Sequence, residues 1–412
     1  MVTETFSRHR VAITGIGVKT PAGCDVETFW STLLAGRSNA GPIKSIDVTN
    51  FPVQFACEIS DFAVDRYFDH KEARRADRVT QLGFAAAADA LADAGDPGVD
   101  PARCGVVAGT GVGGLLTQEQ QEVVLFERGP TRVSPFLVPM MMANATAATI
   151  AMKLGWTGPN FCIATACAAG SHGVGEGARL VREGSADVVL AGGSEAAVTT
   201  IALASFARMD ALSRRSADPQ RASRPFDDDR DGFVIGEGAG FLVLERWDHA
   251  KARGAHIYGE VAGYGRNADA YHVTAPSPGG EGAAACMQLA IADAGLQASD
   301  IGHVNAHGTS TELNDAAEAE AIIKVFGERN IPVTSAKGAI GHLIGAAGAA
   351  EAVASVLAMR DGKVPPTANH DHTELAIDVV AGEPRQLAAA PVVSNSFGFG
   401  GHNASLVLAP PS

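Results

Sequence analysis

The stretch Ala164-Thr165-Ala166-Cys167-Ala168-Ala169-Gly170-Ser171-His172 is a run of small residues that joins a short apolar segment to a helix-like one. A thiol at position 167 would therefore meet the first turn of a helix. The helix dipole and the free backbone N–H groups of that turn favour the thiolate, which is the reactive form of cysteine. Small neighbours leave room for a substrate. A lone buried cysteine is more often an inert hydrophobe, so this prediction depends on partners elsewhere in the chain.

Two other glycine-rich segments supply such partners. They are Asn305-Ala306-His307-Gly308-Thr309-Ser310-Thr311 and Lys337-Gly338-Ala339-Ile340-Gly341-His342. One thiol, two histidines and one lysine in small-residue loops together indicate covalent acyl chemistry.

The chain around these segments alternates strand-like and helix-like patterns. Val11–Thr14 is predicted as a strand, Thr80–Ala94 as an alanine-rich helix and Cys104–Ala108 as a short apolar strand. A helix follows Cys167, and Asp187–Ala191 is a further strand. This alternation is typical of layered α/β folds.

The pattern also repeats. Ala92-Asp93-Ala94-Gly95 precedes the strand Cys104–Ala108 and a glycine-rich turn, and Ala292-Asp293-Ala294-Gly295 precedes Ile301–Ala306 and another such turn. A reactive loop then follows in each half, with a helix predicted over residues 343–359 in the second. We expect two duplicated halves, residues 1–255 with the cysteine and residues 256–412 with the histidines and the lysine, that share one interface.

Composition narrows the class of protein. The chain has 412 residues, of which 46% are apolar, and a net charge of −14, which argues against nucleic-acid binding. Its six cysteines form no CxxC pair and no zinc spacing, which favours a reducing cytoplasm. Residues 1–10 lack an apolar signal core. The apolar stretch 136–156 contains Pro139 and Asn144 and is interpreted as a buried helix rather than a membrane span.

Three motifs suggest other functions. Residues 109–114 fit the G-x-G-x-x-G template of dinucleotide sites, but no strand ending in an acid follows. Residues 227–232 imitate the start of a calcium loop, yet Glu237 misses the last ligand position by one, so a structural turn is favoured. His370-Asp371-His372 could bind a metal but is more typical of a surface loop.

Several further segments match one family in order and spacing: Val11-Ala12-Ile13-Thr14-Gly15-Ile16-Gly17, Arg224-Pro225-Phe226-Asp227, Arg230-Asp231-Gly232-Phe233-Val234, Asp269-Ala270-Tyr271-His272-Val273-Thr274 and Ser396-Phe397-Gly398-Phe399-Gly400-Gly401. With the segments around Cys167, His307 and Lys337, they resemble the condensing enzymes of the thiolase superfamily over nearly the whole chain. The closest resemblance is to the type II β-ketoacyl-acyl-carrier-protein synthases.

This resemblance implies a thiolase-like five-layered αβαβα fold and a decarboxylative Claisen condensation. Cys167 would take an acyl chain from an acyl carrier protein, and malonyl-carrier protein would lose CO₂ and attack the resulting thioester. The product is a 3-ketoacyl chain two carbons longer, as in fatty acid elongation. The alternative is the ketosynthase subunit of a type II polyketide synthase, acting with a chain-length factor.

The resemblance also assigns roles to single residues. His307 and His342 would assist decarboxylation, Lys337 would form an ion pair with Glu351, and the backbones of Cys167 and Phe399 would form an oxyanion hole that the Phe399 ring gates. The remaining substrate contacts are expected at Thr274, Thr309, Thr311 and, as a limit on chain length, Val112. The expected carrier-protein docking residues are Lys71, Arg74, Arg75 and Arg132.

The implied partners are an acyl carrier protein and a second copy of the chain, or a chain-length factor in a heterodimer. No membrane, metal or cofactor is implied, because phosphopantetheine arrives with the substrate. Asp210, Glu312-Leu313-Asn314 and Gly338 depart from the usual pattern near the site and could mark a specialised synthase. Thiolases that do not decarboxylate need a second cysteine near the C-terminus, and this chain has none after Cys286.

Overall fold

The two halves of the chain build the same sheet twice. The computed structural model describes residues 9–412. In the first half the strands lie side by side in the order β1-β7-β6-β4-β5, and in the second half in the order β8-β15-β14-β9-β10, with β12 added at the edge. In both halves the first two neighbouring pairs are antiparallel and the next two are parallel. The duplication predicted from the sequence is therefore present in the topology.

The bounds of these strands are β1 (Val11–Lys19), β4 (Cys104–Gly109), β5 (Asn160–Ile163), β6 (Val188–Ala196), β7 (Glu237–Arg246), β8 (Gly259–Ala268), β9 (His303–Asn305), β10 (Pro332–Thr334), β12 (Asp378–Val379), β14 (Val392–Gly398) and β15 (His402–Ala409). The two half-sheets join where β1 pairs with β8 through Ala12–Glu260 and Ile13–Gly259. Among the described residues this gives one continuous sheet of eleven strands.

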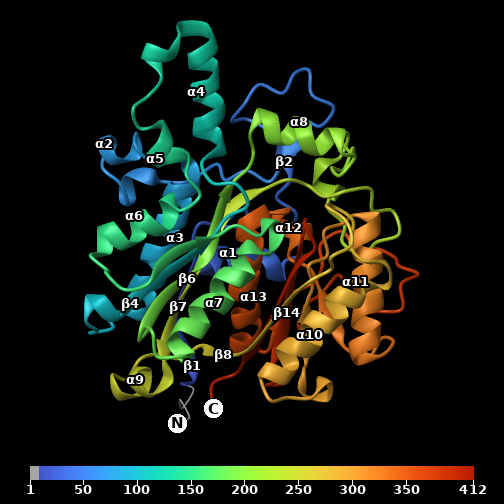
Figure 1. Ribbon diagram of the computed structural model, residues 1–412. Coiled ribbons are helices and arrows are strands. Elements are labelled where there is room, and N and C mark those ends of the chain that lie inside the picture. Colours follow the sequence, from blue (N-terminus) through green and yellow to red (C-terminus); the bar gives the residue numbers. More distant parts are fainter. Residues whose placement is uncertain (1–8) are drawn as a thin grey trace.

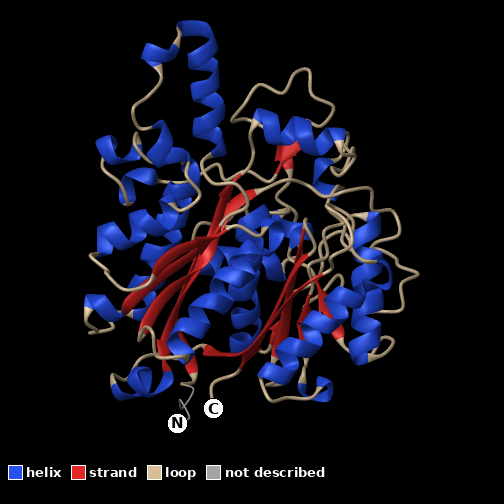
Figure 2. Ribbon diagram, viewed as in Figure 1, coloured by secondary structure: helices blue, strands red, loops and turns tan. Residues whose placement is uncertain are grey.

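Helices cover and separate the two half-sheets (Figure 1). Helix α3 (Arg78–Ala94) packs on the outer face of the first half-sheet, and α10 (Glu281–Asp293) and α11 (Glu312–Phe326) pack outside the second. Between the half-sheets lie α7 (Ala169–Arg182) and α13 (Ala347–Asp361). The expected five-layered αβαβα fold is confirmed, and Figure 2 shows the strands enclosing the central helices.

Alternation along the strands supplies the cores between these layers. In β6 the side chains of Val188 and Leu190 pack toward α3, whereas Val189 and Ala191 pack toward the central helices. Successive side chains of a strand point to opposite faces, so a strand buried on both sides is apolar throughout.

The remaining helices and strands are α1 (Val26–Leu34), α2 (His70–Ala73), α4 (Leu115–Arg128), α5 (Leu137–Met141), α6 (Ala145–Leu154), α8 (Thr200–Arg208), α9 (Trp247–Ala252) and α12 (Lys337–Ile340), and the short pairs β2 (Gly41–Pro42) with β3 (Phe55–Ala56) and β11 (Lys363–Val364) with β13 (Arg385–Gln386). Two 3₁₀ turns, Ala166–Ala168 and Ile344–Ala346, directly precede the central helices α7 and α13.

The buried helix predicted over residues 136–156 is wrong. The segment forms two helices, α5 and α6, that meet at an extended Met142, and the side chains of Val138 and Met152 are exposed. The apolar composition predicts burial, but only one face of α6 packs against the sheet. In the second half, the helix predicted to start at residue 343 starts at Ala347, after the 3₁₀ turn.

The central helices approach each other closely because their contact is made of glycine and alanine. A Cβ at Gly348 of α13 would lie 2.2 Å from the Ser171 hydroxyl of α7, and one at Gly170 would lie 2.8 Å from the Ala349 nitrogen. This closeness brings the N-terminal ends of both helices to one place. No helix within residues 9–412 has the length and apolar character needed to cross a bilayer.

Candidate active site

Cys167 lies in the turn that leads from β5 into α7. The preceding Ala166 has a φ of +49°, in the left-handed region that L residues rarely adopt. The 3₁₀ turn Ala166–Ala168 then places the cysteine directly before the first turn of α7. The side chain is buried, at 8% exposure. A Cβ at Gly398 would lie 3.2 Å from the Cys167 nitrogen, so the β14–β15 connection touches the cysteine turn.

His307 follows β9 and is fixed through its backbone. The carboxylate of Glu318, on α11, accepts hydrogen bonds from the His307 and Gly308 N–H groups at 2.8 and 2.7 Å. The imidazole is buried, and its Nδ1 has no hydrogen-bond partner among the described residues.

His342 follows α12, and a neighbouring peptide fixes the tautomer of its ring. The Ile344 N–H donates to Nδ1 of His342 at 3.2 Å. In a neutral imidazole the proton must then be on Nε2, which makes that nitrogen a donor. Nε2 is buried without a partner in the part of the chain that the structure describes.

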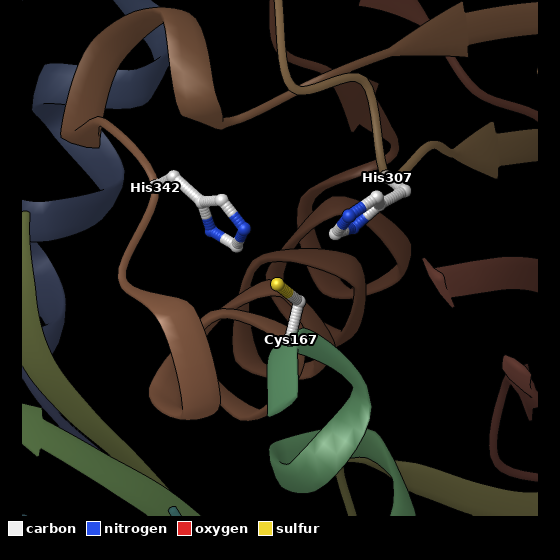
Figure 3. A group of neighbouring side chains, drawn as sticks. All are labelled: Cys167, His307 and His342. Atoms are coloured by element: carbon white, nitrogen blue, oxygen red, sulfur yellow. The ribbon is translucent and has the colours of Figure 1, made fainter. Parts of the chain in front are cut away.

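These three side chains meet at one point, and Figure 3 shows them directed toward one another. The sulfur of Cys167 and one nitrogen of each imidazole lie within 4.8 Å of one another. The two rings are nearly perpendicular, with centroids 5.4 Å apart. The tertiary structure therefore joins one residue of the first half and two residues of the second.

A cavity of about 490 Å³ opens onto this point. Its walls include every side chain expected to contact substrate, namely Val112, Thr274, Thr309, Thr311 and Phe399, in addition to Cys167, His307 and His342. The hydroxyls of Thr309 and Thr311 lie 2.9 Å apart, as a polar pair on one wall. Val112 is 51% exposed, so the cavity is open on this side.

Burial lowers the pKa of both histidines well below the usual value, and the nearby Lys337 ammonium lowers it further. Both rings are therefore neutral at physiological pH. A neutral imidazole with its proton on Nε2 can donate a hydrogen bond to an oxygen that becomes negative, without carrying a charge in the resting enzyme.

The sequence predicts that the helix N-terminus favours the thiolate of Cys167, whereas the folded site favours the thiol. Burial raises the pKa of the thiol to about 11, and the Phe399 N–H and the Lys337 charge lower it only in part. Desolvation outweighs the stabilisation that a helix N-terminus offers. The resting sulfur is a thiol, and its proton must leave as the substrate arrives.

Lys337 and Glu351 form the ion pair that the sequence analysis anticipates. Both side chains are fully buried, and Nζ of the lysine contacts Oε1 of the glutamate. Neither residue lines the cavity. The ammonium therefore acts on the histidines through its charge rather than by touching a substrate.

The backbone of Phe399 lies against the sulfur. The N–H groups of Phe399 and of Cys167 itself lie near the sulfur, and both lower the pKa of the thiol. Phe399 begins the turn between β14 and β15, followed by Gly400 and Gly401, which both have positive φ. Two backbone N–H groups beside a nucleophile are donors of the kind that an oxyanion hole uses. Phe397, by contrast, packs edge-on against the His307 ring.

The expected docking residues lie away from this point. Lys71, Arg74 and Arg75 are exposed in and just after α2, and Arg132 is exposed between α4 and α5. The Arg75 guanidinium lies 4.3 Å from the centroid of the Phe136 ring, which brings α2 beside α5 (Figure 1). The rim of the cavity itself carries Asp210 and Glu312.

The rival sites lack the free donors or ligands that they would need. In the turn 109–114, the Gly111 N–H donates to Glu195, the Gly113 N–H to Thr110 and the Gly114 N–H to a backbone carbonyl, so these donors are not available for a pyrophosphate. In the calcium-like loop, the Asp227 carboxylate accepts N–H groups of residues 371 and 372 and pairs with Arg224. That loop is a structural turn.

The side chains of Cys167, His307 and His342 are of the types that bind metal ions, and their ligand atoms are close enough together to do so. The tautomer of His342 argues against it. A metal would need a bare Nε2, which forces a proton onto Nδ1, and Nδ1 already faces the Ile344 N–H. The three residues fit acyl chemistry better than ligation.

Two buried carboxylates, Glu195 and Glu318, have structural roles that the sequence analysis missed. Glu318 lies in the sequence Ala-Glu-Ala-Glu of α11, where the neighbouring Glu320 is exposed. No local signal distinguishes the two. The position of each glutamate relative to the sheet, which only the fold fixes, decides which one is buried.

Comparisons with known proteins agree with this geometry. The family model described as "Beta-ketoacyl synthase, N-terminal domain" matches residues 8–250, and "Beta-ketoacyl synthase, C-terminal domain" matches residues 258–371. The chain is 46% identical over 411 residues to a 3-oxoacyl-[acyl-carrier-protein] synthase 2 of Synechocystis sp., covering 98% of each chain. It is 45% identical to one of Staphylococcus aureus, covering 97% of this chain and 98% of the relative.

Two solved structures are similar over 98% of this chain and all of theirs. One, described as the ishigamide ketosynthase/chain length factor, has a TM-score of 0.93 at 37% identity. The other, a type II polyketide synthase acyl-carrier protein in complex with its ketosynthase bound to the hexaketide, has a TM-score of 0.90 at 32% identity.

Proposed function

The chain belongs to the β-ketoacyl synthase family, and from this premise we propose that it is a 3-oxoacyl-[acyl-carrier-protein] synthase of fatty acid elongation. It is an acyltransferase that condenses a cysteine-bound acyl chain with malonyl-carrier protein. The observation that carries the proposal is the meeting of the Cys167 sulfur with the nitrogens of His307 and His342, within 4.8 Å, at the wall of one cavity.

In the first step, the sulfur of Cys167 attacks the thioester carbonyl of an acyl-carrier protein. The new S–C bond forms as the carrier's S–C bond breaks, and the thiol proton of the enzyme ends on the departing phosphopantetheine sulfur. The N–H groups of Cys167 and Phe399, which lie near the sulfur, would bind the oxyanion, and one such donor is typically worth about 3 kcal/mol. Because the resting sulfur is a thiol, proton loss and attack belong to the same step.

In the second step, malonyl-carrier protein loses CO₂, and the electron pair of the broken C–C bond moves into an enolate. The proton on Nε2 of His342 is available to the thioester oxygen, and His307 lies beside the same point. The enolate carbon then attacks the Cys167 thioester, the new C–C bond forms as the S–C bond breaks, and the 3-ketoacyl chain departs on the carrier. The Cys167 sulfur leaves as a thiolate and takes a proton from solvent to restore the thiol. Burial, and to a smaller extent the charge of Lys337, lowers the pKa of both rings and keeps them neutral.

The acyl carrier protein is the partner, and its docking surface is proposed at the exposed bases around α2. Carrier proteins are acidic, so a basic patch attracts them in spite of the acidic total charge. Lys71, Arg74, Arg75 and Arg132 provide that patch.

A second copy of the chain is proposed to complete the cavity. Strand β5 ends its half-sheet with an exposed edge, and Phe161 on it is 38% exposed. On the α4–α5 arm that projects from the body in Figure 1, Phe126 and Val138 are 84% and 67% exposed. An open edge beside apolar side chains is typical of an interface between chains. The half-exposed Val112 would be covered there, which would close the acyl space.

The reaction is proposed to need no resident metal or cofactor, because the phosphopantetheine arm arrives on the substrate. We place the enzyme in the cytoplasm, which agrees with six cysteines that are all free thiols.

Intact-mass spectrometry after mixing with an acyl-carrier protein tests the assignment. The protein should gain the mass of one acyl group, and peptide mapping should place it on Cys167. Cys167→Ala should lose the adduct completely. An adduct that persists in this variant refutes the proposal.

The ketosynthase subunit of a type II polyketide synthase is the second candidate, and the solved ketosynthase/chain length factor at TM-score 0.93 is the observation that favours it. The higher identity to the 3-oxoacyl synthases favours elongation. Light scattering of the purified chain separates the two. A homodimer that by itself elongates the acyl chain of acyl-carrier protein supports the role in fatty acid elongation. A chain that catalyses condensation only together with a cysteine-lacking homologue supports the polyketide role.

A further inference from the structure

A buried carboxylate that the proposed reaction does not use lies near the end of β6. Glu195 is 1% exposed, and its hydrogen bonds come only from uncharged donors. It accepts from the Gly111 N–H at 2.5 Å, the Thr110 hydroxyl at 3.0 Å and the Gly345 N–H at 3.1 Å. Among residues 9–412 no cation forms an ion pair with it.

Each of these partners donates to the carboxylate. The Thr110 hydroxyl donates to Oε1 of Glu195, and its oxygen accepts the Gly113 N–H at 3.2 Å. Burial raises the pKa of Glu195 to about 7, although its hydrogen bonds lower it in part, so the carboxyl group is ionised in buffers well above that pH. An ionised carboxylate accepts at both oxygens and fits this set of donors. A carboxamide has a single acceptor oxygen, so it cannot accept from the Thr110 hydroxyl in addition to the two glycine N–H groups, and its NH₂ fits beside Thr110 only if the hydroxyl hydrogen turns away.

One oxygen of Glu195 bridges the two halves of the molecule. Oε2 accepts from Gly111, in the turn after β4, and from Gly345, in the turn before α13. Both turns need a glycine at the position next to the Glu195 carboxylate. A Cβ at Gly111 would lie 2.7 Å from Oε2, and one at Gly345 would lie 2.3 Å from the Gly111 nitrogen.

The two turns that Glu195 connects contribute different parts of the site. Gly111 and Val112 form a wall of the cavity. In the other turn, the Ile344 N–H holds Nδ1 of His342, and the next peptide N–H, that of Gly345, is held by Glu195. Ile344 has a φ of +49°, which is a strained conformation for a β-branched residue and requires such support.

We propose that Glu195 is a positioning residue. It fixes the position of the acyl-cavity wall, at Gly111 and Val112, relative to the ring of His342. A single carboxylate would thereby fix both the space for the acyl chain and the donor for decarboxylation. The inference rests on the proposed function, since it assigns His342 to the second step.

The charge of Glu195 gives this role a distinctive signature. Its negative charge is one of the causes that raise the pKa of the Cys167 thiol. Well above pH 7, where Glu195 is ionised, Glu195→Gln removes that charge, so loss of the thiol proton should become easier. The same change removes the hydrogen bond from the Thr110 hydroxyl, which loosens the turn at Gly111 relative to the ring of His342. The first step should therefore be as fast as in the wild type or faster, while the second step slows.

The experiment measures the two steps separately in the full-length protein. Acylation of Cys167 by an acyl-carrier protein is followed by intact mass, and CO₂ release from malonyl-carrier protein is followed on enzyme that is already acylated. In Glu195→Gln we expect unchanged or faster acylation and a roughly 10- to 100-fold slower second step, as misplacement by about an ångström produces. A parallel fall of both steps, or no change in either, overturns the proposal.

Glu245→Gln is the matched control. Glu245 is a fully buried carboxylate on β7 that pairs with Arg253 and hydrogen-bonds Thr14, and it does not line the cavity. It should leave both steps unchanged relative to the amount of folded protein. Thr110→Val serves if Glu195→Gln does not fold, because it removes one donor and keeps the charge. It should slow the second step a few-fold and leave acylation unchanged, and equal rates for both steps in wild type and Thr110→Val would overturn the proposal.

The two levels of inference fail differently. A wild-type protein that forms no adduct on Cys167 refutes the proposed function. A wild-type protein that performs both steps, with Glu195→Gln behaving like Glu245→Gln, refutes only the role of Glu195.

Discussion

The two turns that lead into the central helices have the same backbone conformation but different roles in the site. Ala166 and Ile344 both have a φ of +49°, and each begins a 3₁₀ turn that leads into α7 or α13. In the first half the next residue is Cys167, whereas in the second it is Gly345. The duplicated backbone fixes where a reactive group can be placed, and the side chain decides which half carries it.

The segments before these turns differ as well. In the first half β5 runs almost directly into the turn, whereas in the second half the connection from β10 includes α12, with Lys337 at its start and His342 after its end. The second half has exchanged its nucleophile position for a longer connection that carries a charge and a donor. A duplicated fold can thus divide one reaction between its halves.

Removing the buried charge of the second connection should have the largest effect on stability. Lys337→Met leaves Glu351 buried without its partner, and breaking a buried pair typically costs about 3–5 kcal/mol of unfolding free energy. Urea unfolding measures it. Lys337→Met with Glu351→Leu should recover most of the loss, and no recovery in the double variant would contradict the pairing.

Removing the donor of the second connection should separate the two steps. His342→Ala should keep acylation of Cys167 and slow condensation by roughly 10²- to 10³-fold, as loss of a transition-state donor does. The measurement is intact mass for the first step and CO₂ release for the second. Loss of acylation to the same extent would mean that the two turns do not divide the reaction as described.

Adding a side chain at Gly345 tests whether the second turn has room for one, as the first turn has at Cys167. In Gly345→Ala the new Cβ meets the Gly111 nitrogen at 2.3 Å, which is backbone and cannot yield easily. We expect a loss of about 1–3 kcal/mol in unfolding free energy, together with slower condensation. Ala349→Gly on α13 is a control that removes volume instead. Wild-type stability in Gly345→Ala would show that the turn is less tightly packed than described.

The strand that leads to His307 contains a second, buried histidine. His303 of β9 is buried, neither ring nitrogen has a partner among the described residues, and burial lowers its pKa to about 3. The unfolded chain takes up this proton near pH 6.5. Stability is therefore complete above that pH and falls as the pH drops toward 3, by up to about 1.4 kcal/mol per pH unit.

His303→Leu should remove this sensitivity. Between pH 8 and pH 5 the variant should lose about 2 kcal/mol less unfolding free energy than the wild type. Urea unfolding at the two pH values measures the difference, and the exposed His256 provides a control as His256→Leu. Equal losses in wild type and His303→Leu would contradict the assignment.

The smallest effect is expected at the first turn. Ala166→Gly relieves the left-handed strain before Cys167, and we expect a change within about 1 kcal/mol in stability. The rate of acylation reports whether the strain also orients the sulfur. A slower first step at unchanged stability would show that it does.

The sequence alone determined the alternation of strands and helices, the duplication and the identity of Cys167, His307, His342 and Lys337. Those features can be predicted from the linear sequence, because each depends on short motifs and on the order in which they follow one another. It did not reveal that residues 136–156 split into two helices, because apolar composition does not specify which face is covered.

Only the tertiary structure decided the roles of Glu195 and Glu318 and the protonation of Cys167. A glutamate is buried or exposed according to the layer that closes over it, as Glu318 and Glu320 show within one helix. The thiol pKa follows from the water that the two halves exclude when they meet. Desolvation and long-range hydrogen bonds depend on residues far apart in the chain, so no single segment carries that information.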